Sequence, residues 1–169
     1  MIAAVVAVDE NFAIGNKGDM LVHIRGDLKM FRELTSGHTV VMGRKTFEAL
    51  PNGPLPNRRN IVISSQAQGK AFEMHDDKGT YILSSMENVM EMFSSCRDEM
   101  LFVIGGGVIY KELLSYCERI YLTKIKKSFP EADTYFPNID FMPEWRKTVI
   151  GKTQHENGVD YQFCIYDRQ

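Results

Sequence analysis

Cysteine is scarce in this sequence, and its placement excludes two kinds of site. Only Cys96, Cys117 and Cys164 occur, so the number is odd, and no two of them lie at a spacing typical of metal ligands. Neither a framework of disulfides nor a cysteine metal centre is therefore expected. We interpret the three as reduced, mostly buried thiols of a protein in a reducing compartment, which favours the cytoplasm.

An excess of charge of either sign is lacking too. Twenty Lys and Arg side chains against 22 Asp and Glu give a formal net charge of −2, which gives no sign of a nucleic-acid or anionic-membrane partner. An anionic ligand would have to be met by particular arginines and lysines. No apolar run is long enough to span a membrane. The start, MIAAVVAVDE, is short, has no basic region and ends in acidic residues, so we expect a buried strand there rather than a signal peptide.

What is present is an ordinary globular composition. The chain has 169 residues, of which 44% are hydrophobic and 25% charged, enough to bury one sizeable core. No repeat, low-complexity tract or linker divides it. We expect a single domain over residues 1–169 and, because no exposed apolar stripe demands a partner, a monomer.

Short apolar runs rich in β-branched residues indicate strands. They are residues 2–8, 38–42, 60–64, 80–83, 101–105 and 119–125. Several are apolar at consecutive positions, which is typical of a sheet covered on both faces. Near the C-terminus, Asn157–Gly158 predicts a hairpin whose strands add to one edge in antiparallel fashion.

Helical patterns lie between these runs, at residues 27–34, 84–93 and 108–114. In the second, Ser84 and Glu87 have the spacing of a capping box. The alternation of strands and helices predicts an α/β protein with a mainly parallel sheet and helices on both faces.

Two strand–glycine–helix junctions could hold anions. In VVMGRKTFEAL (40–50), Gly43 precedes a helix that opens with two cations and a hydroxyl, and free N–H groups at a helix start favour an anion. A solvated basic turn explains this stretch equally well, and its spacing is not that of a P-loop. In VIGGGVIY (103–110), three glycines permit close approach of a phosphate or of another backbone, but the G-x-G-x-x-G fingerprint is absent. Two such junctions favour a ligand with two phosphate clusters, such as a dinucleotide.

The stretch MLVHIRGDLKMF (20–31) places a single carboxylate, Asp27, among mostly apolar residues where a helix is expected to begin. An N-cap aspartate would be common and sufficient there. Alternatively, Asp27 stands at the mouth of an apolar cleft, where partial desolvation would raise its pKa and a planar amidine-like ligand could pair with it.

Taken together, these pieces resemble dihydrofolate reductase, over nearly the whole chain. The residues that carry the resemblance are AVVAVDENFAIGNKGDM, GDLKMFRELT, HTVVMGRKTFEAL, PLPNRRNIVISS, LFVIGGGVIY, IYLTKI and ADTYFP, in the family's order. The resemblance implies an eight-stranded, mainly parallel sheet and the NADPH-dependent reduction of 7,8-dihydrofolate to tetrahydrofolate, which supports one-carbon metabolism. It also implies a small-molecule substrate, antifolate inhibitors as further ligands of the same site, and no metal.

The resemblance also assigns substrate residues. Asp27 matches the family's catalytic acidic residue, which holds the pterin, and Thr123 matches the threonine bonded to it. Arg58 matches the arginine that clamps the glutamate α-carboxylate. The other residues expected at the substrate are those that wall the rings or turn a carbonyl toward them: Val5, Leu28, Phe31, Leu50, Leu55 and Ile104.

For the cofactor, three groups of residues match the family's NADPH site. The group expected around the nicotinamide is Ala7, Ala13, Ile14, Gly15, Asp19 and Met20. The group expected at the phosphates and adenosine is Gly43, Arg44, Lys45, Thr46, Ser64 and Ser65, with Arg44 and Ser64 at the 2′-phosphate. The third lies at the pyrophosphate and comprises Gly105, Gly106, Gly107, Val108, Ile109 and Tyr110. In the family the Gly105–Gly106 peptide is typically cis.

The sequence departs from the family pattern at four positions. Leu21, Val22 and Arg25 stand where the family commonly has proline, tryptophan and proline. Val108 replaces a frequent polar or basic residue. The changes at 21, 22 and 25 bear on loop closure and antifolate affinity, and Val108 on one phosphate contact.

Two other functions share part of this pattern. A pterin or riboflavin-pathway reductase of the same fold would have no use for Arg58 as a tail clamp. A non-catalytic nucleotide- or folate-binding module would bind both ligands without turnover, and the missing cleft tryptophan leaves some room for it.

Overall fold

The predicted apolar runs lie side by side as strands of one sheet. The structure, a computed structural model, describes residues 1–169. The order across the main path of the sheet is β11 (Trp145–Ile150), β13 (Val159–Arg168), β9 (Arg119–Ile125), β1 (Ile2–Val8), β8 (Leu101–Gly105), β4 (Thr39–Gly43), β5 (Arg59–Ile63), β7 (Gly79–Ser84) and β6 (Ala71–Asp76). The short β12 (Gln154–Glu156) pairs with β13 beside this path. None of the helices has the length and apolarity that crossing a membrane requires.

The mainly parallel, mixed character of the sheet is confirmed. Strands β9, β1, β8, β4, β5 and β7 pair in parallel, and β13, β11, β12 and β6 are antiparallel. The predicted hairpin at Asn157–Gly158 joins β12 to β13. The sheet has ten strands rather than eight. One strand missing from the expected set is β6, whose residues are mostly exposed, so that it carries no buried apolar run.

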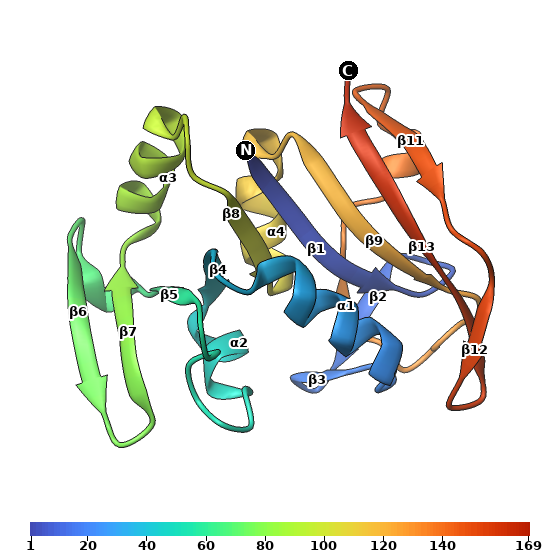
Figure 1. Ribbon diagram of the computed structural model, residues 1–169, viewed down its shortest axis with the longest axis horizontal. Helices are drawn as coiled ribbons and strands as arrows, with labels where there is room; N and C mark the ends of the chain where they lie inside the picture. Colours follow the sequence, from blue (N-terminus) through green and yellow to red (C-terminus); the bar gives the residue numbers. More distant parts are fainter.

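Four α-helices cover the sheet, and they lie on both of its faces. Their bounds are α1 (Arg25–Thr35), α2 (Arg44–Glu48), α3 (Met86–Ser95) and α4 (Gly107–Leu113). Short 3₁₀ turns follow at η1 (Ser65–Ala67), η2 (Leu114–Tyr116) and η3 (Ile139–Phe141). In Figure 1, α1 crosses in front of the sheet and α4 lies behind it. The crossovers β1–α1–β4 and β8–α4–β9 therefore run on opposite faces.

Strand β1 shows why both faces are apolar. Its residues 2, 4, 6 and 8 belong to one core cluster, which includes residues of α3 and α4. Ala3 and Val5 belong to a second cluster, against which Phe31 and Leu34 of α1 pack. Because successive side chains of a strand point to opposite faces, a strand between two helical layers is apolar throughout.

The start of α3 differs by one residue from the expectation. Ser85, not Ser84, is the N-cap, and its hydroxyl accepts a hydrogen bond from the N–H of Asn88 at 3.1 Å. Ser84 is instead the last residue of β7, so the capping box expected from Ser84 and Glu87 is wrong. The shift arises because β7 extends one residue beyond its predicted end.

A second, small sheet stands beside the ends of the parallel strands. It consists of β10 (Thr134–Tyr135), β2 (Ala13–Asn16) and β3 (Asp19–Met20). The fully buried Asp9 holds its base, because its carboxylate accepts bonds from the N–H groups of Asn11, Ala13 and Phe129 at 2.7–2.9 Å. This sheet carries the segment expected to contact the nicotinamide.

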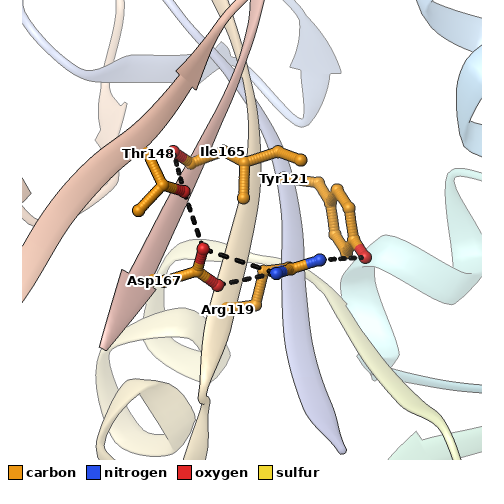
Figure 2. Close-up of polar contacts among 5 residues, drawn as sticks. All are labelled: Arg119, Tyr121, Thr148, Ile165 and Asp167. Atoms are coloured by element: carbon orange, nitrogen blue, oxygen red, sulfur yellow. Dashed lines mark hydrogen bonds and ion pairs between the residues drawn. The ribbon is translucent and has the colours of Figure 1, made fainter. Parts of the chain in front are cut away.

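An ion pair joins the C-terminal strands, as Figure 2 shows. The guanidinium of Arg119 on β9 donates to Asp167 on β13 through Nε, at 2.7 Å, and more weakly through a second nitrogen at 3.4 Å. Thr148 on β11 donates to Asp167 Oδ2, the oxygen that also accepts the weaker Arg119 bond, at 2.6 Å. These bonds hold the pKa of Asp167 below its usual range, with the Arg119 bond contributing most.

We predict that Asp167→Asn destabilises the protein at neutral pH but not in acid. A carboxylate whose pKa is depressed in the folded state stabilises the fold above its unfolded pKa and loses this effect as the pH falls through the folded value. Since the two side chains keep 32% and 31% of their surface exposed, water screens the pair, and we expect a loss of about 1 kcal/mol at pH 7. Urea unfolding of both proteins at pH 7 and below pH 4 measures it. An equal difference at both pH values would contradict the assignment.

Candidate active site

The carboxyl group of Asp27 is buried between α1 and β9. Thr123 Oγ1 donates to Asp27 Oδ1 at 2.5 Å, and Asp27 is only 8% exposed. No cation lies within ion-pair distance of it. Burial raises the pKa of Asp27, and the bond from Thr123 opposes this rise in part. The shift expected from an apolar setting is therefore confirmed.

Asp27 does not cap its helix. Helix α1 begins at Arg25, two residues earlier than expected, and the N-cap residue is Ile24. Asp27 is thus the third residue of the helix, and its side chain faces β9. The structure contradicts the interpretation of this aspartate as a cap, and its burial against β9 agrees with the second interpretation, a partly desolvated carboxylate.

Three apolar side chains expected around the substrate gather against one core cluster. Phe31, Leu50 and Leu55 are each half-buried against the same core cluster, the one that contains Val5 and Phe102. The guanidinium of Arg58 lies over the ring of Phe31, 5.9 Å from its centroid. The structure therefore brings together residues from α1, the loop 49–58 and the sheet. Leu28, also expected at the substrate, lies outside this cluster and is 44% exposed.

Arg58 is held in place without an anionic partner. Its Nε donates to the carbonyl of Pro56 at 2.9 Å, and another nitrogen donates to Thr35 Oγ1 at 3.0 Å. Burial, and then repulsion from Arg32, lower its pKa. A partly buried guanidinium whose positive charge is not neutralised is suited to bind a carboxylate.

The loop that carries Arg58 depends on Asn60, which the sequence did not suggest. The buried amide of Asn60 accepts from the N–H of Leu55 at 2.9 Å and donates to the carbonyls of Leu55 and Arg58, each at 3.0 Å. One side chain thus fixes two predicted substrate residues. Its only sequence signal is a polar residue inside an apolar strand.

The carbonyls of Val5 and Ile104 lie on the neighbouring strands β1 and β8. The buried Tyr110 hydroxyl donates to the carbonyl of Val5 at 2.6 Å. Burial and the charge of Asp27 raise the pKa of Tyr110, so its hydroxyl remains a donor.

The position of Ile104 follows from an irregularity in strand pairing. The pairing of β8 with β4 shifts register so that Val41 faces Val103 and Met42 faces Gly105. Ile104 therefore has no paired residue on β4.

The two strand–glycine–helix junctions meet. A Cβ on Gly43 would come within 3.0 Å of Ile109 Cγ1, and one on Gly106 within 3.2 Å of Thr46 Oγ1. The starts of α2 and α4 are thus packed against each other, and glycine permits the contact. The Gly105–Gly106 peptide is cis, as in the family. The structure thus brings the start of α2, expected at the phosphates and adenosine, against the glycine triplet expected at the pyrophosphate.

Next to these junctions is a cavity of about 430 Å³ at the end of β5. Its walls are formed by Ile63, Ser64, Ser65, Gln68, Gly69, Ser85, Met86 and Glu87. Ser64 also accepts a bond from the N–H of Gln66 at 3.2 Å, which begins η1. Since Gly43 pairs with Ile63, Arg44 and Ser64 follow neighbouring strand ends. Arg44 and Lys45 are exposed, and Arg44 Nε lies 3.5 Å from Glu48 Oε1.

The residues expected around the nicotinamide lie at the junction of β1 and the small sheet. Ala13 is buried, Ile14, Gly15 and Ala7 are half-buried, and Asp19 and Met20 are exposed. Asp133, which the sequence did not single out, holds this segment: its carboxylate accepts from the N–H of Lys17 at 2.9 Å, and its own N–H donates to the carbonyl of Gly15 at 3.0 Å. Val108, in the third group, is 71% exposed.

Comparison with known proteins decides the family. A model of the family "Dihydrofolate reductase" matches residues 1–168. The dihydrofolate reductase of Bacillus subtilis is 39% identical and aligns with all of this chain and 95% of its own length. That of Aedes albopictus is 35% identical over 97% of this chain and 95% of its own.

The chain belongs to the dihydrofolate reductase family. A solved structure, dihydrofolate reductase from Enterococcus faecalis complexed with NADP(H) and RAB-propyl, superposes with a TM-score of 0.81 at 34% identity. The match covers all of this chain and 96% of that one. The α/β fold with antiparallel edge strands is the fold of this family, and the protein is an NADPH-dependent oxidoreductase that reduces dihydrofolate to tetrahydrofolate.

We predict that Thr123→Val raises the pKa of Asp27 further. The Thr123 hydroxyl stabilises the charged carboxylate, and valine has the same shape without a donor. A ¹³C NMR titration of the aspartate carboxyls in the free enzyme measures the change. Thr148→Val, which removes a hydroxyl that donates to Asp167 rather than to Asp27, is the control. An unchanged or lowered Asp27 pKa in Thr123→Val would contradict the assigned hydrogen bond.

Proposed function

We propose that the whole chain, residues 1–169, is one dihydrofolate reductase domain in which Asp27 is the catalytic carboxylate. The observation that carries this proposal is the buried, uncompensated Asp27 carboxyl, bonded to Thr123 at 2.5 Å. A carboxylate with no cation of its own can accept the N3–H and 2-amino group of a pterin through two parallel hydrogen bonds. We further propose a cytoplasmic monomer that acts on small molecules and has no nucleic-acid partner.

Asp27 acts by biasing protonation of the bound ring. Its negative charge beside the pterin favours the protonated heterocycle, and water delivers the proton to N5. Bound NADPH supplies the hydride that C6 receives, so that the N5–C6 double bond becomes a single bond. The protein's contribution is alignment of the two rings, because reacting atoms held in contact avoid most of the entropic cost of their encounter.

The remaining residues divide between the two ligands. Phe31, Leu50 and Leu55 form the apolar wall for the rings, and Arg58 binds the α-carboxylate of the glutamate tail. The fit of the dinucleotide is supported by the close contact between the starts of α2 and α4, where glycines leave room for a phosphate to approach the backbone. Arg44 and Ser64 at neighbouring strand ends are suited to a 2′-phosphate.

The decisive variant for the catalytic role is Asp27→Asn, assayed by dihydrofolate-dependent loss of NADPH absorbance across pH. The amide cannot stabilise a protonated pterin, so we expect activity at neutral pH to fall by about 100-fold or more, with partial recovery at low pH where dihydrofolate is already protonated. Asp77→Asn, in the exposed turn between β6 and β7, serves as a control of equal charge change. Wild-type activity of Asp27→Asn at every pH would refute the role.

The tail clamp separates this proposal from a reductase of untailed pterins. Arg58→Leu is expected to raise KM for dihydrofolate roughly 30-fold, the equivalent of about 2 kcal/mol, and to leave KM for a dihydropterin without the glutamate unchanged. Arg59→Leu removes the neighbouring charge and is the control. Equal preference of the wild-type enzyme for tailed and untailed substrates would favour the alternative reductase.

A further inference from the structure

The N-terminus of α1 receives no cap from its own sequence. Its N-cap residue, Ile24, has no hydrogen-bonding atom in its side chain. The first bond within the helix runs from the N–H of Leu28 to the carbonyl of Ile24 at 3.0 Å. The N–H groups of Arg25, Gly26 and Asp27 precede that bond, so any partner they have must come from outside the helix.

Glu156, at the end of β12, fills this role from 130 residues away along the chain. Its Oε1 accepts the N–H of Gly26 at 3.2 Å, and its Oε2 accepts the N–H of Arg25. One carboxylate thus satisfies two of the three free donors, and its negative charge lies at the positive end of the helix.

Three further contacts seat the C-terminal hairpin on the same turn of α1. The side-chain amide of Asn157 donates to the carbonyl of His23 at 3.0 Å. Ile24 is buried in a small cluster with Ile125, Val159 and Tyr161. Gly26 is so close to β13 that a Cβ there would lie 2.5 Å from the Tyr161 hydroxyl. The hairpin therefore touches residues 23–26 on several sides.

We propose that Glu156 is a positioning residue for dihydrofolate binding. By fixing the first turn of α1, it holds Asp27, the third residue of that turn, against Thr123 on β9. This inference rests on the proposed role of Asp27. Because β13 pairs with β9, and Ile125 faces Tyr161 two residues beyond Thr123, the hairpin and Thr123 fix the same turn of the helix from adjacent strands.

Glu156→Ala tests the inference through two readouts. Exchange of the Arg25 and Gly26 amides, followed by NMR in the free enzyme, is expected to accelerate about tenfold or more. KM for dihydrofolate is expected to rise about tenfold, while KM for NADPH stays within twofold, because the cofactor residues lie on other elements. Glu156→Gln keeps one acceptor oxygen and is expected to limit the rise in KM to about threefold.

Asp160→Asn is the matched control, since it lies in the same hairpin and its carboxylate contacts only the exposed His155. A merely structural role of Glu156 would lower the active fraction and leave both KM values unchanged. That result overturns the inference, as does unchanged exchange at the Arg25 and Gly26 amides.

The Asp27→Asn variant separates this inference from the proposed catalytic role. If Asp27→Asn is inactive while Glu156→Ala binds dihydrofolate normally, only the positioning role fails. If Asp27→Asn is fully active, the proposed catalytic role fails, whatever exchange shows.

Discussion

The hydrogen bond between Thr123 and Asp27 is the constraint on which the site depends. It joins a helix to a strand that lies 96 residues later in the chain, and it is the only side-chain hydrogen bond Asp27 makes. A carboxyl group buried in this way has lost most of its hydration and has gained one neutral donor in return. No cation compensates this carboxylate in the free protein, so its charge is available to a ligand that brings its own hydrogen-bond donors, as the proposed pterin does.

The parallel sheet determines where the Asp27 carboxylate lies. Crossovers on opposite faces put α1 and α4 on either side of β1 and β8, and ligands usually bind beyond the carboxyl ends of such strands. On one side, helix α1 carries Asp27 and Phe31. On the other, the glycines at the start of α4 pack on Thr46 of α2. In the proposed arrangement two rings lie against each other there, and their charged tails leave in different directions, toward Arg58 and toward the cavity beside Ser64.

Much of this arrangement could be predicted from the sequence, because it depends on residues that are neighbours along the chain. Consecutive apolar residues in β1 predicted burial on both faces, and the glycines before α2 and α4 predicted close approach. Strand β6 could not be found this way, since its exposed side chains leave no apolar signal and its pairing depends on β7. The start of α1 was misplaced for a related reason. Its cap is Glu156, and no local rule links a helix start to a residue 130 positions away.

The site residues were identified through resemblance more than through pattern. Composition and spacing alone left Asp27 with two interpretations, and they were separated by burial and by Thr123, neither of which is visible along the chain. Asn60 and Asp133 were missed because each is a single polar residue whose importance comes from the backbone groups it binds. Such residues hold the backbone of the proposed binding segments in place, and their effect is a property of the folded chain.

The central claim is that the Asp27 carboxylate faces a bound pterin. A crystal structure of the protein with NADPH and folate tests it most directly. The account predicts both Asp27 carboxylate oxygens within hydrogen-bond distance of the pterin N3 and 2-amino group, with the nicotinamide ring against the opposite face of the pterin. A pterin bound elsewhere, or an Asp27 carboxylate turned toward solvent, would contradict it.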